Sequence, residues 1–228
     1  MSRSFSSTEA MHNNGNIPIT AYPFTMFAWG NKDVQDGGGS DDVMMGMTDD
    51  SASLIYQLLS TTNAGSGTSV GMVSRNSSTQ QAARGTTEIA LDTWYSTCGI
   101  CRGNTDREIF LEGVTEDTDA NSVTWNSNID SIAIGARRSS GGFTTFYEGR
   151  LSHCAVYNVS LSTTHQLALS RGAHPFIMRN DALVFFCAVE GNDSPEGDYV
   201  GQSAQQTLSG SPPKFVGNPP VELLENYL

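Results

Sequence analysis

Short stretches in which apolar residues alternate with small or polar ones recur along almost the whole chain. Clusters of glycine, serine, asparagine and aspartate separate them. This period of two is the pattern of half-buried β-strands joined by turns. The pattern predicts strands at 3–6, 21–30, 42–47, 53–59, 69–74, 86–90, 94–101, 109–113, 130–135 and 146–157. In the last of these the alternation shifts near 151–154, which indicates a β-bulge.

A single segment has the character of a helix. Ser160 or Ser162 can cap a segment that runs to about Ser170, and Gly172 follows its end. Regular short strands with few helical segments are typical of a sandwich. We therefore predict an all-β fold, a jelly-roll sandwich of two antiparallel sheets with one short helix.

Size and charge narrow the picture. The 228 residues suit one all-β domain, so we assign 1–218 to a single sandwich and 219–228 to a C-terminal tail. The formal charge of −12 opposes nucleic-acid binding, because phosphates require a basic surface. No apolar run approaches the roughly 18 residues of a membrane span, and the N-terminus lacks the apolar part of a signal peptide. We therefore expect no membrane partner and synthesis in a cytoplasm.

The four cysteines are expected to be free and buried. Cys98 and Cys101 have the spacing of a zinc or redox pair, but residues three apart on a strand point to opposite faces. No second pair of this kind completes a four-ligand zinc site. Cys154 and Cys187 lie among apolar strand residues, where a free thiol packs as a small hydrophobe.

Three segments occur in a characteristic order. They are EIFLEG at 108–113, DSIAIGAR at 130–137 and FYEGRLSHCAVYNVSLS at 146–162. This series resembles the laminin-G-like, concanavalin A-like lectin and glucanase jelly rolls. The resemblance implies the same sandwich that the alternation predicts. It leaves the function open, because lectins, hydrolases and structural modules share this fold.

The two ends of the chain carry a further resemblance. The opening MSRSF and the region 182–221 are similar to laminin-G-like proteins of tailed phages. The matching positions near the C-terminus are Leu183, Val184, Phe185, Gly191, Asp198, Val200, Gly201, Leu208, Ser209, Gly210, Pro219 and Pro220. This resemblance implies a location in the virion, with assembly in the host cytoplasm, where cysteines stay reduced.

No catalytic residues can be assigned from the sequence. A retaining glycosidase needs two carboxylates about 5–5.5 Å apart, and the Glu-x-Asp-x-x-Glu pattern usual for this fold is missing. Glu108 and Glu112 share a strand parity, but Glu112 lies at the turn after the strand. The four histidines stand in no nucleophile motif such as GxSxG. We therefore predict a protein that is not an enzyme.

The sequence offers candidate residues for two kinds of ligand site, a calcium site and a glycan site. Acidic loops hold oxygen ligands of the kind that calcium prefers, but such loops are more often acidic for solubility, so we assign no metal site and no cofactor. The candidate acids are Asp33, Asp36, Asp41, Asp42, Asp49, Asp50, Glu116, Asp117 and Asp119. A glycan would need an aromatic platform at a loop rim. For this role we name Trp125, Phe143 and Tyr147, beside the loop 139–142, and expect Trp29 and Trp94 to be buried.

The C-terminal tail suggests a contact with another protein. Leu223, Leu224, Tyr227 and Leu228 lie outside any predicted strand, so they fold back on the domain or insert into a partner. We predict a structural virion protein, a capsid decoration or cement subunit that binds the major capsid protein and copies of itself as a homo-oligomer. The alternative is a lectin-like module of a phage tail or fibre that recognises host glycans.

Overall fold

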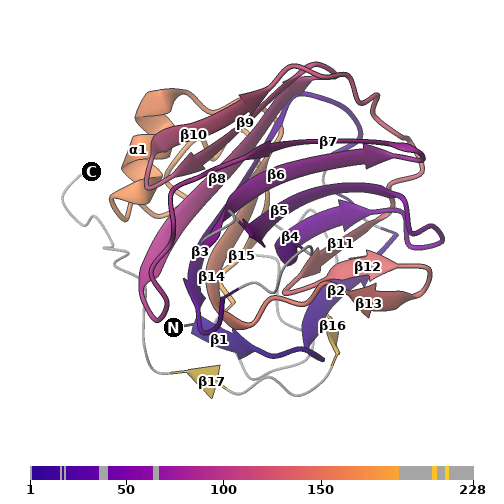
Figure 1. The fold of residues 1–228 in the computed structure, drawn as a ribbon. Coiled ribbons are helices and arrows are strands. Elements are labelled where there is room, and N and C mark those ends of the chain that lie inside the picture. The colour runs from indigo at the N-terminus through magenta and orange to yellow at the C-terminus, as the bar shows by residue number, and fades with distance from the viewer. Residues whose placement is uncertain are drawn as a thin grey trace.

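The computed structural model describes residues 2–15, 17, 19–35, 41–63, 67–189, 207–209 and 214–215. Two antiparallel sheets stack as a sandwich, and one short helix lies beside the outer end of one sheet (Figure 1). The predicted all-β sandwich of two antiparallel sheets with one short helix is thus confirmed for these residues. The tail residues Leu223, Leu224, Tyr227 and Leu228 lie outside the described residues.

The first sheet has eight strands, and β14 lies near its centre. In spatial order the strands are β10 (Val114–Asp119), β9 (Asp106–Leu111), β8 (Trp94–Gly103), β3 (Phe24–Lys32), β14 (Gly149–Tyr157), β1 (Ser2–Phe5) and β17 (Lys214–Phe215). The eighth strand, β15 (Leu183–Cys187), also pairs with β14. Strands from both ends of the chain therefore meet in one sheet.

The second sheet has seven strands, and a two-stranded hairpin packs beside it. In spatial order the strands are β16 (Thr207–Ser209), β2 (Ala10–Asn14), β11 (Ser131–Ile134), β4 (Asp42–Thr48), β5 (Ile55–Asn63), β6 (Thr68–Asn76) and β7 (Thr79–Arg84). The hairpin consists of β12 (Arg137–Ser139) and β13 (Gly142–Thr144) and lies against β4 and β11 (Figure 1).

Alternation along the strands separates three apolar regions, which are the main core between the sheets and one cluster on the outer face of each sheet. Residues such as Met47 of β4 and Leu59 of β5 point between the sheets and form the main core. On β8, Cys101 belongs to this core, whereas Cys98 belongs to an apolar cluster on the outer face of the eight-stranded sheet. The predicted opposite orientation of these two thiols is confirmed, and all four cysteines are buried, as predicted.

The single helix of the described residues, α1 (Thr163–Ser170), covers part of this outer cluster. Ser162 is its N-cap, and its side chain accepts a hydrogen bond from the His165 N–H. Leu169 is fully buried in the outer cluster. A Cβ at Gly113 would lie 2.7 Å from the Ser170 Oγ, so the helix can approach the β9–β10 turn closely because residue 113 is glycine.

The predicted bulge in the long strand is present. The pairing of β14 with β3 changes register between Ser152 and Ala155, and His153 has a φ of +52°. Because the bulge turns the backbone, the alternation of buried positions shifts there.

Some strand predictions need correction. The segment 86–90 is not a strand; the strand in this region is β7, Thr79–Arg84, which ends two residues earlier. Strands β2, β12 and β13 were not predicted. Strand β7 is an edge strand whose polar residues are largely exposed, so it lacks the apolar alternation by which strands were predicted.

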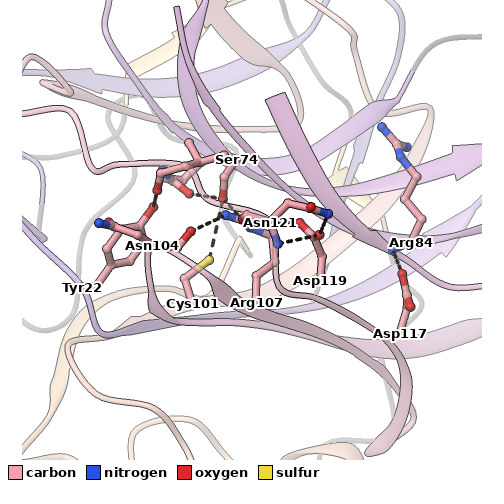
Figure 2. Close-up of polar contacts among 11 residues, drawn as sticks. Tyr22, Ser74, Arg84, Cys101, Asn104, Arg107, Asp117, Asp119 and Asn121 are labelled. Atoms are coloured by element: carbon pink, nitrogen blue, oxygen red, sulfur yellow. Dashed lines mark hydrogen bonds and ion pairs between the residues drawn. The ribbon is translucent and has the colours of Figure 1, made fainter. Parts of the chain in front are cut away.

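A buried ion pair ties the loops at one end of the sandwich to both sheets (Figure 2). Arg107 of β9 is 1% exposed and forms an ion pair with Asp119. Its guanidinium also donates to the carbonyl oxygens of Asn121 at 2.8 Å and Asn104 at 3.1 Å, and to the Ser74 Oγ at 3.3 Å. Every nitrogen of this guanidinium therefore has an acceptor, which offsets the loss of hydration.

The polar network continues from Ser74 to Tyr22, in the loop that precedes β3. The Ser74 Oγ donates to the Gln57 Oε1 at 2.6 Å, and the Gln57 Nε2 lies 3.4 Å from the Tyr22 hydroxyl. The Tyr22 hydroxyl donates to the Val123 carbonyl at 3.0 Å. Burial raises the pKa of Tyr22 to about 12, so the phenol keeps its proton and remains a donor.

Candidate functional site

A pocket of about 190 Å³ opens at the end of the sandwich where β8 begins and β9 ends. Its wall includes Glu88, Ile89, Thr93, Trp94, Leu111 and Glu112. Apolar side chains, an indole and two carboxylates thus meet in one concave site. A concave, mainly apolar surface with a few polar groups is the usual form of a small-ligand site.

Trp94, the first residue of β8, is only half-buried. Part of it packs against the outer apolar cluster, which holds it in place. The sequence pattern led us to expect a buried Trp94, because aromatic residues on sandwich strands are usually core. Trp29, in contrast, is 1% exposed, as expected. The difference arises because Trp94 lies at the strand end, where no neighbouring strand covers it on every side.

The wall behind Trp94 is braced by a pair of tyrosines. Tyr95 also lines the pocket, and its hydroxyl lies 2.9 Å from the Tyr147 hydroxyl. Tyr147 itself is fully buried in the main core. Its ring is therefore not available to a glycan in this conformation, and Tyr147 contributes only by supporting Tyr95.

Glu112 is held at the pocket by the backbone. Its φ is +52°, and the Glu112 Oε1 accepts the Ser96 N–H at 2.6 Å. The Oε2 of Glu112 makes no hydrogen bond with the described residues. Desolvation of the carboxylate raises the pKa of Glu112, although the residue as a whole remains exposed. One carboxylate oxygen can therefore accept a hydrogen bond from a ligand.

Glu88 supplies the second carboxylate. The Glu88 Oε1 accepts the Gln35 Nε2 at 3.1 Å. A Cβ added at Gly67 would lie 2.2 Å from the Glu88 side chain, so this side chain packs directly on the glycine backbone. The close approach fixes where the carboxylate can lie.

A family model described as the concanavalin A-like lectin/glucanases superfamily matches residues 6–165. The chain belongs to this superfamily. A search of curated proteins gave no match.

Three solved structures illustrate the likeness in fold. A Bacteroides ovatus protein proposed to bind carbohydrate aligns over 97% of this chain with 16% identity and a TM-score of 0.67, and this chain spans 61% of its length. A native heptameric SAP-like pentraxin from Limulus polyphemus has 16% identity and a TM-score of 0.59, covering 74% of this chain and 81% of its own.

A third structure contains a bound sugar. The CBM40 of the Ruminococcus gnavus IT-sialidase, solved with α2,3-sialyllactose, has 13% identity and a TM-score of 0.54. It covers 75% of this chain and 98% of its own. At these identities the likeness establishes the fold of this concanavalin A-like chain and nothing more.

The three aromatic residues predicted to bind a glycan do not form one platform in the concanavalin A-like sandwich. Trp125 is half-buried against Tyr22 and Phe24, with ring centroids 5.5 Å and 5.8 Å away. Phe143 is partly exposed on the β12–β13 hairpin, where it contacts His12. Tyr147 lies in the core.

Most candidate calcium ligands already accept hydrogen bonds or charges from the protein. The ion-pair partners are Lys32 for Asp42, Arg84 for Asp41, Arg107 for Asp119, Arg138 for Asp50, and Arg150 for Asp33. The remaining described acids accept backbone N–H groups, from Ser51 to Asp49, from Thr87 to Glu116 and from Arg84 to Asp117. Asp36 lies outside the described residues, among which no group of three or more metal-ligating side chains occurs.

Glu108 and His153 already contact other residues of the protein. Glu108 accepts from Arg102 at 2.6 Å and from the Thr115 hydroxyl at 2.9 Å. His153 is 6% exposed and its ring lies 5.1 Å from that of His174. Burial and the neighbouring His174 lower the pKa of His153 to about 3, so this imidazole stays neutral.

The described helix is too short to cross a membrane.

Proposed function

We propose that this concanavalin A-like domain is a non-catalytic carbohydrate-binding module and that the pocket beside Trp94 binds a neutral sugar. The observation that carries the proposal is the pocket itself, in which a half-exposed indole and a carboxylate with one free oxygen line the same concavity. Solved structures of the same fold that are proposed or named as carbohydrate binders support the same class of function.

The residues of the pocket match the two surfaces of a sugar ring. The C–H face of a pyranose is apolar and packs on an indole or on side chains such as Ile89 and Leu111. Its hydroxyl groups are donors, and the carboxylate oxygens of Glu112 and Glu88 are acceptors. Two carboxylates in one site repel a third, so we expect neutral rather than acidic sugars here.

The size of the pocket limits how much ligand it can hold. Sites for drug-sized ligands have volumes of about 300–1,000 Å³, whereas this pocket has about 190 Å³. We therefore expect it to take one terminal sugar unit of an oligosaccharide, with the rest of the ligand in solvent.

The proposal also states that the domain does not hydrolyse the sugar that it binds. Both oxygens of the Glu108 carboxylate already accept hydrogen bonds, and the Oε1 of Glu112 accepts a backbone N–H. Glycoside hydrolysis needs two carboxylates that are free to act as acid and as nucleophile or base, and each of these two already accepts a hydrogen bond from the protein. Incubation with the bound oligosaccharide should release no reducing sugar; release that is lost in Glu112→Gln would overturn this part.

The test compares two aromatic residues on the protein surface. A neutral oligosaccharide found on a glycan array is titrated into wild type, Trp94→Ala and Phe143→Ala by calorimetry. We expect Trp94→Ala to weaken binding by roughly tenfold or more, since aromatic hot spots contribute about 2 kcal/mol. Phe143→Ala, which removes a partly exposed aromatic elsewhere, should bind as wild type does. The reverse result would return the site to the position predicted from the sequence.

Glu112→Gln tests the same pocket without removing Trp94, so its result can be used even if Trp94→Ala does not fold. Glutamine keeps the shape and the acceptor for the Ser96 N–H but loses the charge. We expect the Kd to rise several-fold with an unchanged melting temperature. Because the pKa of Glu112 is raised, wild-type binding should weaken as the pH falls through that raised value, and the variant should not show this step. Equal pH profiles would remove Glu112 from the site.

The role as a capsid decoration or cement subunit stays a prediction, as do the virion location, the capsid-protein partner and the homo-oligomer. The resemblance at the two ends of the chain to laminin-G-like phage proteins is what favours it. Densitometry of purified particles would test it: hundreds of copies per virion support a cement, and tens or fewer support a glycan-binding appendage.

A further inference from the structure

One arginine on the outer face of the seven-stranded sheet has no polar partner. Arg137 of β12 is half-buried, and its guanidinium carbon lies 4.9 Å from the centre of the Tyr56 ring. The Nε atom is buried, and the side chain of Arg137 makes no hydrogen bond or ion pair with the described residues. A buried guanidinium nitrogen without an acceptor is unusual, because it loses hydration without compensation.

A second polar atom without a partner belongs to the same patch. Thr48 is completely buried, and its Oγ1 has no hydrogen-bond partner among the described residues. Thr48 of β4 is the register partner of Tyr56 of β5, so the two side chains project from the same face as neighbours. Arg137 and Thr48 therefore flank the same tyrosine.

The acids close to this patch are already neutralised. Asp50 forms an ion pair with Arg138, the residue next to Arg137. On the far side of the face, Asp41 forms an ion pair with Arg84. The positive charges of Arg138 and Arg84 are thus paired with acids. The positive charge of Arg137 is not, although the chain has a net charge of −12.

The patch is also rigid and partly shielded from water. The Tyr56 hydroxyl donates to the Gln80 Oε1 at 2.9 Å, which fixes the ring beneath the guanidinium. Tyr56 packs with Leu58 and Val73 in an apolar cluster on this face. A guanidinium held over a fixed ring beside apolar groups loses little entropy when it binds, and its hydrogen bonds are stronger than in water.

We propose that Arg137, held over the Tyr56 ring, forms a binding site for a carboxylate-bearing ligand, distinct from the Trp94 pocket. The planar guanidinium fork matches a carboxylate, which accepts two parallel hydrogen bonds from it. The carboxylate can come from an acidic sugar or from a simple organic acid, and the site would give the domain a specificity opposite to that of the acidic pocket.

Two sugars that differ by one group test the site. The Nε–Hε signal of Arg137 is followed by NMR at low salt during titrations with D-glucuronate, D-glucose, acetate and inorganic phosphate. We expect both carboxylates to shift this signal saturably and glucose to leave it unchanged. Tighter binding of glucuronate than of acetate identifies an acidic sugar as the ligand, and equal binding identifies any organic acid; both results support the site.

Variants separate binding from folding. Arg137→Met should weaken glucuronate binding by roughly tenfold to a hundredfold, the range expected for a hydrogen-bonded charge. The matched control is Arg102→Met, which removes an arginine from the other sheet and should bind normally. Unchanged affinity in Arg137→Met, phosphate binding as tight as glucuronate, or no saturable shift with either carboxylate would overturn the proposal.

The outcome of these titrations does not depend on whether the Trp94 pocket binds a neutral sugar. A neutral oligosaccharide should still bind to Arg137→Met, because the Trp94 pocket contains no residue of the patch. Added salt should weaken glucuronate binding and leave the neutral sugar unaffected, since screening acts on the charged pair.

Discussion

Arg107 and Arg137 occupy the same sandwich and have opposite surroundings. Arg107 lies at the end of the core, where an ion pair and three neutral oxygens give each nitrogen of its guanidinium an acceptor (Figure 2). Arg137 lies on the outer face with only an aromatic ring beneath it. The comparison teaches that burial of a charge alone does not mark a functional residue. What distinguishes the two is whether the protein supplies the acceptors.

The largest effect is expected from Arg107. Replacing it by alanine leaves Asp119 buried without its counter-charge, which we expect to lower the free energy of unfolding by about 3–5 kcal/mol. Urea denaturation measures the loss. Arg102→Ala is the control, because its ion pairs are exposed and should contribute less than about 1 kcal/mol. Similar losses in both variants would show that the Arg107 network is not a stabilising unit.

A smaller loss is expected from the other side of the ion pair. Asp119→Asn keeps an oxygen near Arg107 and near the Asn121 N–H, which lies 3.1 Å from the Asp119 Oδ1. We expect a destabilisation of about 1.5–3 kcal/mol, the range for hydrogen bonds to charged groups. In the double variant with Arg107→Ala the two losses should not add, and full additivity would contradict a direct interaction.

Thr48→Val should change stability in the other direction. The Thr48 hydroxyl is buried without a partner, and removal of an unsatisfied polar group relieves its desolvation penalty. We expect a gain of about 1 kcal/mol in the ligand-free protein, measured by urea denaturation. A loss of similar size would mean that the hydroxyl has a stabilising role in the ligand-free protein, which would weaken the contrast with Arg107.

The smallest effect is expected from Arg137 itself. Arg137→Met removes a cation–π contact that contributes about 0.5–1 kcal/mol and no hydrogen bond among the described residues. The methionine chain can still pack on Tyr56. We therefore expect a melting temperature close to that of wild type, and a large decrease would place Arg137 with Arg107 as a structural residue.

Features that depend on strand period or on local chemistry could be predicted from the sequence. The opposite faces of Cys98 and Cys101 follow from alternation. The helix was predicted from Gly172 after its end and from a serine cap, Ser160 or Ser162, of which the structure has Ser162. The bulge in β14 appeared as a shift of parity. Strand β7 could not be found in this way, because an exposed edge strand needs no apolar face.

The candidate sites could not be predicted, because each depends on what lies next to a side chain in three dimensions. Trp94 was assigned to the core, since its residue type does not reveal that it lies at an open strand end. Arg137 and Arg138 form a basic pair in the sequence, and the sequence does not reveal that Arg138 has an acidic partner and that Arg137 has none. A possible signal was the basic pair itself, which stands out in so acidic a chain.

One measurement tests the carbohydrate-binding account most directly: a glycan array probed with wild type, Trp94→Ala and Arg137→Met. The account predicts that wild type binds neutral oligosaccharides, that Trp94→Ala loses them, and that Arg137→Met keeps them while losing any glycan that ends in a carboxylate-bearing sugar. A wild-type protein that binds no neutral glycan, or a Trp94→Ala variant that binds them undiminished, would contradict it.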